Sequence, residues 1–175
     1  MRELSLKKIA EEENAELRIQ ESKIPGEMGV YLTERSYLFT IKYKQKTIII
    51  LMETGLSAIG RASCSICSPN EYMEFEMTTR NHIASLFFRK DRFKLVCKDP
   101  NIEVFFNQSI GMANLKEIAK NTAFEPTIFG INFENSYQLI LEYSLIFSEW
   151  HQVVKPIILL YKEFLDKFGE IKWHD

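Results

Sequence analysis

Glycine and cysteine are both scarce in this sequence. Only seven of the 175 residues are glycine, and they do not stand at the spacing of a glycine-rich phosphate-binding loop. The three cysteines are an odd number and do not make a disulfide framework. These shortages argue against a nucleotide-binding loop and against a disulfide-stapled secreted scaffold. We therefore expect reduced thiols, as is usual in cytoplasmic proteins.

Long apolar runs are also missing. The longest uninterrupted one is Ile48–Met52, far shorter than the roughly 20 residues that a membrane-spanning helix needs. The opening segment, MRELSLKKIAEEENAEL, lacks the apolar core of a signal peptide. We expect no membrane span and a cytoplasmic location.

Neither sign of charge dominates the chain, whose formal net charge is −2, but the charges are unevenly distributed. From Arg80 to Lys98, six basic residues stand against Asp91 alone, a local net charge of +5. They are Arg80, Arg89, Lys90, Arg92, Lys94 and Lys98. Such a stretch suits an acidic protein surface, including the acidic half of a second copy, or phosphate groups. The near-neutral total argues against nucleic acid as the partner.

The composition is that of an ordinary globular protein, with 46% hydrophobic and 26% charged residues. We predict one domain over residues 1–175. Residues 1–14 are expected to form a peripheral N-terminal helix, because Leu6, Ile9 and Ala10 have helical spacing.

Alternating and β-branched segments predict two hairpins. Residues 36–43 alternate aromatic or aliphatic with other side chains, and residues 46–53 are rich in isoleucine and threonine. Lys44-Gln45 between them would be the turn, although it is not the Asn-Gly that a two-residue turn prefers. Residues 126–133 and 137–144 form the second pair. The apolar run within 46–53 predicts a central strand that is buried on both faces.

Shorter patterns predict the remaining elements. Strands are expected over residues 15–20, 58–66, 72–77 and 92–98. Asp99 before Pro100 is an N-cap followed by a first-turn proline, which predicts a helix that ends near Gly111. A second short helix follows around residues 115–119. Residues 80–88 fit either a helix or a strand paired with 92–98, and we favour the helix.

A long amphipathic helix is predicted over residues 148–168. Its apolar residues recur at intervals of three and four; they are Trp150, Val153, Val154, Ile157, Tyr161, Phe164, Leu165 and Phe168. Pro156 removes one backbone hydrogen bond, so either the helix kinks there or residues 150–155 form a separate turn. The predicted fold class is α+β: a mainly antiparallel sheet built from two hairpins plus extra strands, covered by this helix and shorter ones.

Cys64 and Cys67 form the only recognisable chemical motif. A redox pair of this spacing normally opens a helix, but Ser68-Pro69-Asn70 continues as a turn. In a strand, positions three apart point to opposite faces. Two part-buried structural cysteines are therefore the simpler interpretation. A zinc site lacks a second ligand pair, because Cys97 stands alone.

The histidines do not add a catalytic or metal-binding pattern. His82, His151 and His174 share no ligand spacing, and the chain has no Gly-x-Ser-x-Gly nucleophile elbow. We assign no catalytic residue, no metal ligand and no cofactor, and the sequence favours a non-enzymatic role.

Three functions fit these observations, and the sequence alone does not decide between them. The leading hypothesis is a non-catalytic cytoplasmic protein-interaction domain with a charge-polarised surface. The second is a small-molecule-binding domain with an apolar pocket between the sheet and the C-terminal helix. That pocket would be lined by Phe39, Tyr43, Phe129, Tyr143, Trp150 and Tyr161. The third is a thiol-dependent redox enzyme that uses Cys64 and Cys67.

Overall fold

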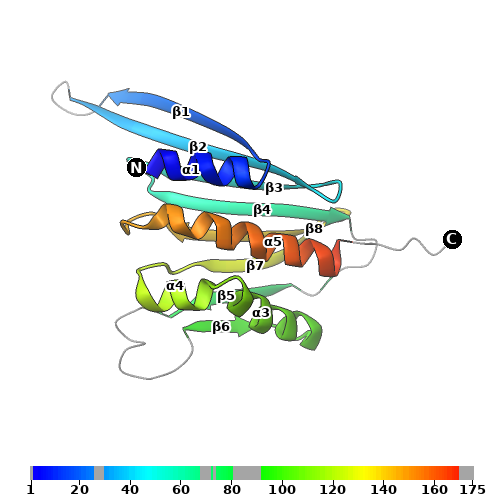
Figure 1. The fold of residues 1–175 in the computed structure, drawn as a ribbon. Helices are drawn as coiled ribbons and strands as arrows, with labels where there is room; N and C mark the ends of the chain where they lie inside the picture. Colours follow the sequence, from blue (N-terminus) through cyan, green and yellow to red (C-terminus); the bar gives the residue numbers. More distant parts are fainter. Residues whose placement is uncertain (1, 26–29, 68–71, 73, 81–91, 170–175) are drawn as a thin grey trace.

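The strands of this protein form one antiparallel sheet. The computed structural model describes residues 2–25, 30–67, 72, 74–80 and 92–169 (Figure 1). Eight strands lie in the order β1-β2-β3-β4-β8-β7-β5-β6. They are β1 (Glu16–Pro25), β2 (Tyr31–Tyr43), β3 (Lys46–Thr54), β4 (Ile59–Cys67), β5 (Phe75–Thr79), β6 (Phe93–Val96), β7 (Thr127–Phe133) and β8 (Ser136–Ser144). Every neighbouring pair is antiparallel, as predicted.

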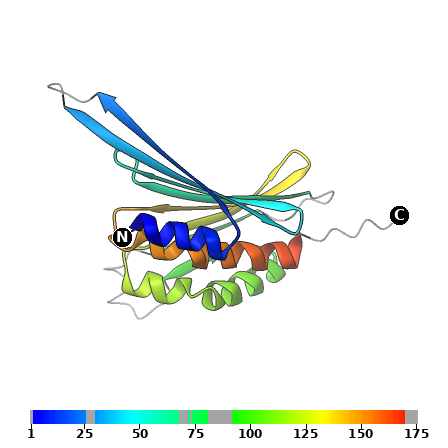
Figure 2. The ribbon, with the colours of Figure 1, turned by 45° about the horizontal axis from the view of Figure 1, so that its top comes forward.

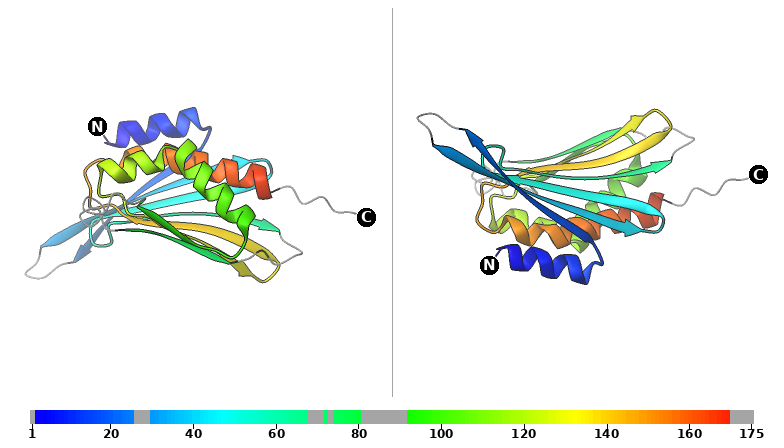
Figure 3. Two further views of the ribbon diagram at one scale, coloured as in Figure 1. Left: turned by 90° about the horizontal axis from the view of Figure 1, so that it is seen from below. Right: turned by 90° about the horizontal axis from the view of Figure 1, so that it is seen from above.

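The described helices all cover the same face of this sheet (Figures 2 and 3). They are α1 (Arg2–Glu12), α3 (Pro100–Met112), α4 (Leu115–Asn121) and α5 (Val154–Phe168), the last preceded by the 3-10 turn η2 (Trp150–Val153). This arrangement confirms the predicted α+β class and the long C-terminal cover. Within the described ranges, none of the helices combines the length and apolarity needed to cross a bilayer.

β1 and β2 form a hairpin that the sequence does not predict. β1 and β2 pair without interruption from Glu16 opposite Thr40 to Pro25 opposite Tyr31. Its distal part projects beyond the body of the sheet (Figures 1 and 2). The sequence predicts only a separate strand over residues 15–20, because the following residues, Glu21 to Lys23, do not alternate in polarity. They do not need to, since this part of β1 is exposed and covers no core.

The turn between β2 and β3 adopts an unusual conformation for its residues. Lys44 and Gln45 have φ values of 46° and 61°, the left-handed values that a type I′ turn requires at both central positions. Asparagine or glycine would adopt them more easily. The long pairing of β2 with β3 imposes the conformation, and Lys44 also forms an ion pair with Asp166 at 2.8 Å.

The C-terminal helix resolves the question raised by Pro156. The 3-10 turn ends at Val153, and α5 begins at Val154. Pro156 therefore lies in the first turn of α5, where a backbone N–H has no intrahelical acceptor to lose. The separate-turn alternative is the correct one, except that the helix begins two residues before the proline.

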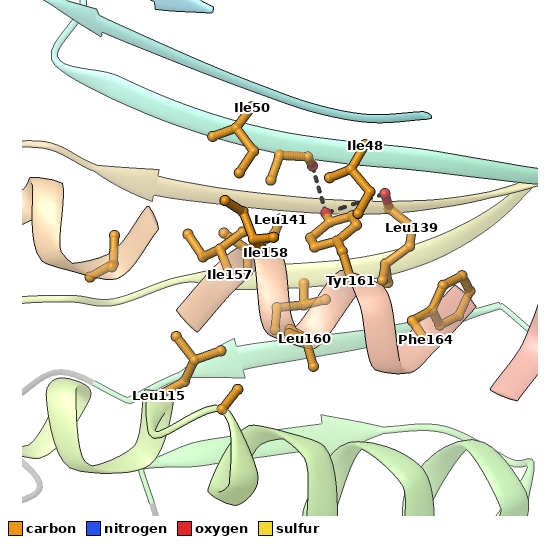
Figure 4. Close-up of a cluster of buried hydrophobic side chains, with 14 of the residues drawn as sticks. Ile48, Ile50, Leu115, Leu139, Leu141, Ile157, Ile158, Leu160, Tyr161 and Phe164 are labelled. Atoms are coloured by element: carbon orange, nitrogen blue, oxygen red, sulfur yellow. Dashed lines mark hydrogen bonds between the residues drawn. The ribbon is translucent and has the colours of Figure 1, made fainter. Parts of the chain in front are cut away.

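Interlocking side chains from α5, β3 and β8 fill the centre of the core (Figure 4). The fully buried members drawn there include Ile48, Ile50, Leu139, Leu141, Ile157, Leu160 and Tyr161. The Tyr161 hydroxyl donates to Ala62 O at 2.7 Å and also lies 3.3 Å from Leu139 O. Because these carbonyls belong to the paired strands β4 and β8, one side chain anchors α5 across the middle of the sheet.

The prediction that residues 46–53 are buried on both faces is wrong. β3 is an interior strand, but its buried residues Ile48, Ile50 and Met52 all face the helices. Ile49 on the other face is 42% exposed, and Leu51 is half-buried. The physical reason is that all the described helices lie on one face, so half of an apolar run faces outward.

Two expectations fall on residues whose structure is not described. The choice between helix and strand for residues 80–88 concerns positions 81–91, which lie outside the described ranges. The predicted turn at Ser68-Pro69-Asn70 lies outside them as well.

Candidate functional site

The six aromatic residues expected to line a pocket do not lie around one cavity. Four of them, Phe39, Tyr143, Trp150 and Tyr161, are buried on the helix-covered face. Phe129 points to the opposite face, together with Ile140, its cross-strand neighbour in the register. Tyr43 lies near the C-terminal end of α5, where its hydroxyl donates to Asp166 at 2.9 Å.

The orientation of β7 differs from the prediction, which placed Phe129 in the space beneath the C-terminal helix. Ile128, fully buried, and Gly130 occupy that side instead. Gly130 leaves room there for the ring of Tyr137, because an added Cβ would lie 2.0 Å from the Tyr137 hydroxyl. In β7, the small residue Gly130 therefore faces the core and Phe129 faces away from it.

The described thiols lack the environment of a redox centre. Cys64 is 4% exposed on the helix-covered face, and burial raises its pKa from 9.0 to about 12. A reactive thiol needs a lowered pKa instead. Cys67 is the last residue of β4 and lies opposite Ser136 in β8. The structure does not describe its side chain. Cys97 is half-buried, and its sulfur accepts from Asp99 N at 3.3 Å.

Cys64 should be inert in the folded protein. In a variant carrying Cys67→Ser and Cys97→Ser, we expect its reaction with a disulfide reagent at pH 8 to be at least ~100-fold slower than in urea, because only opening exposes it. Its pKa also predicts how stability depends on pH. The unfolded thiol ionises near pH 9.0 while the folded one keeps its proton, so this contribution is complete below pH 9.0 and is lost as the pH rises towards 12. Rapid native labelling would contradict the buried placement.

The basic stretch does not form one surface among the described residues. Arg89 and Lys90 lie outside the described ranges, while Arg80, Lys94 and Lys98 are exposed. Arg92 is only 7% exposed. Its guanidinium donates to Arg80 O at 3.1 Å and pairs with Glu125 at 2.9 Å, so it ties β6 to neighbouring loops.

The histidines and acidic residues form no metal site in the part of the chain that the structure describes. His82 and His174 lie outside that part. His151 belongs to η2, and burial lowers its pKa.

The face of the sheet opposite the described helices carries an apolar surface. We call it the open face and define it by Leu38, Ile49, Leu51, Val96, Phe129, Ile131 and Ile140. The register connects these side chains directly: Ile49 lies opposite Ser63, which lies opposite Ile140, which lies opposite Phe129. Because cross-strand neighbours share a face, the row crosses β3, β4, β8 and β7, and none of the described helices lies above it.

Polar side chains also lie on the open face. Arg61 donates to Glu142 at 2.7 Å across β4 and β8, so this pair brings no net charge to the centre. Towards the β6 edge, a depression of about 450 Å³ contains Phe129, Ile131 and Val96 beside the acidic Glu74 and Glu76. The surface is apolar in the middle and charged at intervals.

No family model, curated protein or solved structure matches this chain. Its function must therefore be inferred from the geometry of its surfaces. Sequence reasoning missed the open face because it assigned apolar runs to two-sided burial. The sequence did contain a signal, namely the apolar runs Leu139–Leu141 and Ile48–Met52. In a sheet that helices cover on one face only, every such run exposes alternate residues on the other face.

Proposed function

We propose that this chain is a non-catalytic protein-interaction domain and that its partner binds to the open face. The observation that carries the proposal is the set of apolar side chains on the open face, among them Ile49 at 42% and Val96 at 60% exposure, on a sheet whose described helices all lie on the other side. Contiguous apolar patches of this kind on soluble proteins mark interaction sites.

The size of the open face supports a protein partner over a small ligand. With a strand spacing of about 4.8 Å, the eight strands span roughly 38 Å, and five residues along a strand add roughly 17 Å. This gives a face of roughly 600 Å², close to the ~800 Å² that each side of a specific protein interface buries. A face this broad and shallow would leave a small molecule mostly in water.

The side chains also indicate the chemistry of the partner. Its contact surface should be apolar opposite Ile49, Ile140 and Phe129. It should also offer hydrogen-bonding groups near the centre, where Arg61 and Glu142 are already paired and need only partial compensation. A sheet or helix with one apolar face meets this description.

Two leucine-sized side chains of equal exposure allow a matched test. Ile49 on the open face and Leu159 on the outer side of α5 are both 42% exposed. A photo-crosslinking amino acid placed at either position in the native host should capture a partner from position 49 and not from 159. The partner should then bind the purified chain, and Ile49→Lys should weaken that binding at least ~10-fold while Leu159→Lys leaves it unchanged.

Unfolding midpoints of both variants provide the control, and we expect them to stay near that of the wild-type chain. Equal capture from the two positions, or unchanged affinity after Ile49→Lys, would contradict binding at the open face.

A further inference from the structure

The strand β1 forms an exposed edge of the sheet. It pairs with β2 along its whole length, and no other described strand lies on its outer side. Its register contains no bulge, and its only proline, Pro25, stands at its end. Proteins usually protect long edges with charged side chains, bulges, prolines or a covering element, because unpaired backbone groups attract another strand. Along residues 16–24, β1 carries the charged Glu16, Arg18, Glu21 and Lys23 but no bulge, no proline and no covering strand among the described residues.

A groove beside this edge is suited to receive side chains from an added strand. It runs between α1 and β1 and has a volume of about 280 Å³. Both polar and apolar residues line it; they are Lys7, Ala10, Glu11, Asn14, Ala15, Leu17 and Ile19. Ala15 N donates to Ala10 O at 2.8 Å, which places the start of β1 against the last turn of α1.

We propose that two copies of this chain pair through β1, antiparallel and with the two-fold axis at Ile19. An axis perpendicular to the sheet keeps each residue on its own face, so it must pass through a residue position. With the axis at Ile19, this side chain contacts Ile19 of the second copy, and Ala15 lies opposite Lys23.

Charge complementarity favours a second copy of this chain as the partner of β1. Lys23 of the second copy would lie over Ala15 and beside Glu11, and the same contact would recur by symmetry. Glu11 and Lys23 are both exposed, and neither forms an ion pair with another described residue. On the other face of the strand, Arg18 would lie opposite Gln20 and would not meet a like charge.

Other registers are less favourable. An axis at Arg18 or at Glu21 places two like charges opposite each other. An axis at Gln20 sets Ile19 against Glu21, whereas the axis at Ile19 sets Leu17 against Glu21 but keeps the contact between the two Ile19 side chains. An axis at Ser22 would pair Glu21 with Lys23, but within β1 it joins only residues 19–25, and Glu21 already forms an ion pair with Arg35. An axis at Leu17 pairs only residues 15–19, because the chain enters α1 beyond them, whereas the axis at Ile19 pairs residues 15–23.

The pairing would join the two sheets edge to edge, with the helices of both copies on one side and both open faces on the other. It is therefore independent of binding at the open face. Ile49→Lys should leave the dimer intact, and disruption of the dimer should leave the open face accessible.

Sedimentation equilibrium of the full chain tests the proposal. We expect a dimer, and Ile19→Lys should raise its dissociation constant at least ~10-fold because two ammonium groups would meet at the axis. Val104→Lys, at a position on α3 that is 55% exposed, is the control for an added lysine and should not change the mass. A monomeric wild-type chain at ~100 µM, well above the micromolar range of weak specific interfaces, would overturn the proposal.

Two further variants test the register itself. Glu11→Lys and Lys23→Glu should each weaken the dimer, and the double charge swap should restore it. In a chain with Cys67→Ser and Cys97→Ser, Ile19→Cys should form an intermolecular disulfide, whereas Gln20→Cys should not, because diagonal positions are too far apart. A dimer that shows neither the restoration nor the Ile19→Cys disulfide would overturn the proposed register.

Discussion

Leu160→Ala is expected to lower the free energy of unfolding by about 2–5 kcal/mol, whereas Leu159→Ala should lower it by less than about 1 kcal/mol. The two leucines are neighbours in α5, but Leu160 is fully buried and Leu159 is 42% exposed. The first substitution leaves a cavity in the core of Figure 4, and the second removes a side chain that contacts water. Urea unfolding followed by tryptophan fluorescence measures both.

The pair is internally controlled, because both substitutions change helix propensity by the same amount. The dependence of the free energy on urea should stay the same in both variants if the folded and unfolded states keep their compactness. Equal losses at the two positions would mean that α5 is rotated relative to the sheet or that its outer side is covered.

Gly130→Ala should destabilise the protein by about 1–3 kcal/mol, although alanine is normally accepted more easily than glycine in regular structure. A Cβ at this position would lie 2.0 Å from the Tyr137 hydroxyl and 2.5 Å from a ring carbon of Phe75. Both rings are buried, so neither has open space into which it can move. Thermal unfolding of the variant measures the loss.

Gly111→Ala is the matched substitution with the opposite sign. Gly111 lies in the last turn of α3, and an added Cβ would meet nothing within 4 Å. Alanine there should stabilise the protein by up to about 1 kcal/mol, because it restricts the unfolded chain and favours the helix. A stabilising effect at Gly130 would show that Tyr137 does not occupy the space above it.

The sequence predicted those elements whose cause is local. Asp99 caps α3, with its side chain accepting from Asn101 N at 2.8 Å, because the Asp-Pro pair carries the information within a few residues. The two hairpins and α5 follow from periodicity in the same way. The conformation of Lys44 and Gln45 does not, since it is imposed by strand pairing on either side.

The candidate sites depend on which face is covered, and local patterns do not contain that information. Ile128 and Phe129 are adjacent in β7, so their side chains point to opposite faces of the sheet. Both are apolar, and the sequence therefore does not show which of the two faces the core. The position of the helices decides between them. For the same reason the open face and the β1 edge emerge only from the assembled sheet.

The order of the strands also has a consequence for synthesis on the ribosome. β8, which joins the four-stranded meander β1–β4 to β7, β5 and β6, comes from residues 136–144, which follow β5, β6, α3, α4 and β7 in the chain. Pairing of β4 with β8 closes a long loop and must wait for the late segment to emerge. Until then the nascent meander exposes a second edge at β4 as well as its uncovered core residues. α5, the cover of that core, follows β8 in the chain, so the core residues of the meander stay uncovered until both segments have been synthesised.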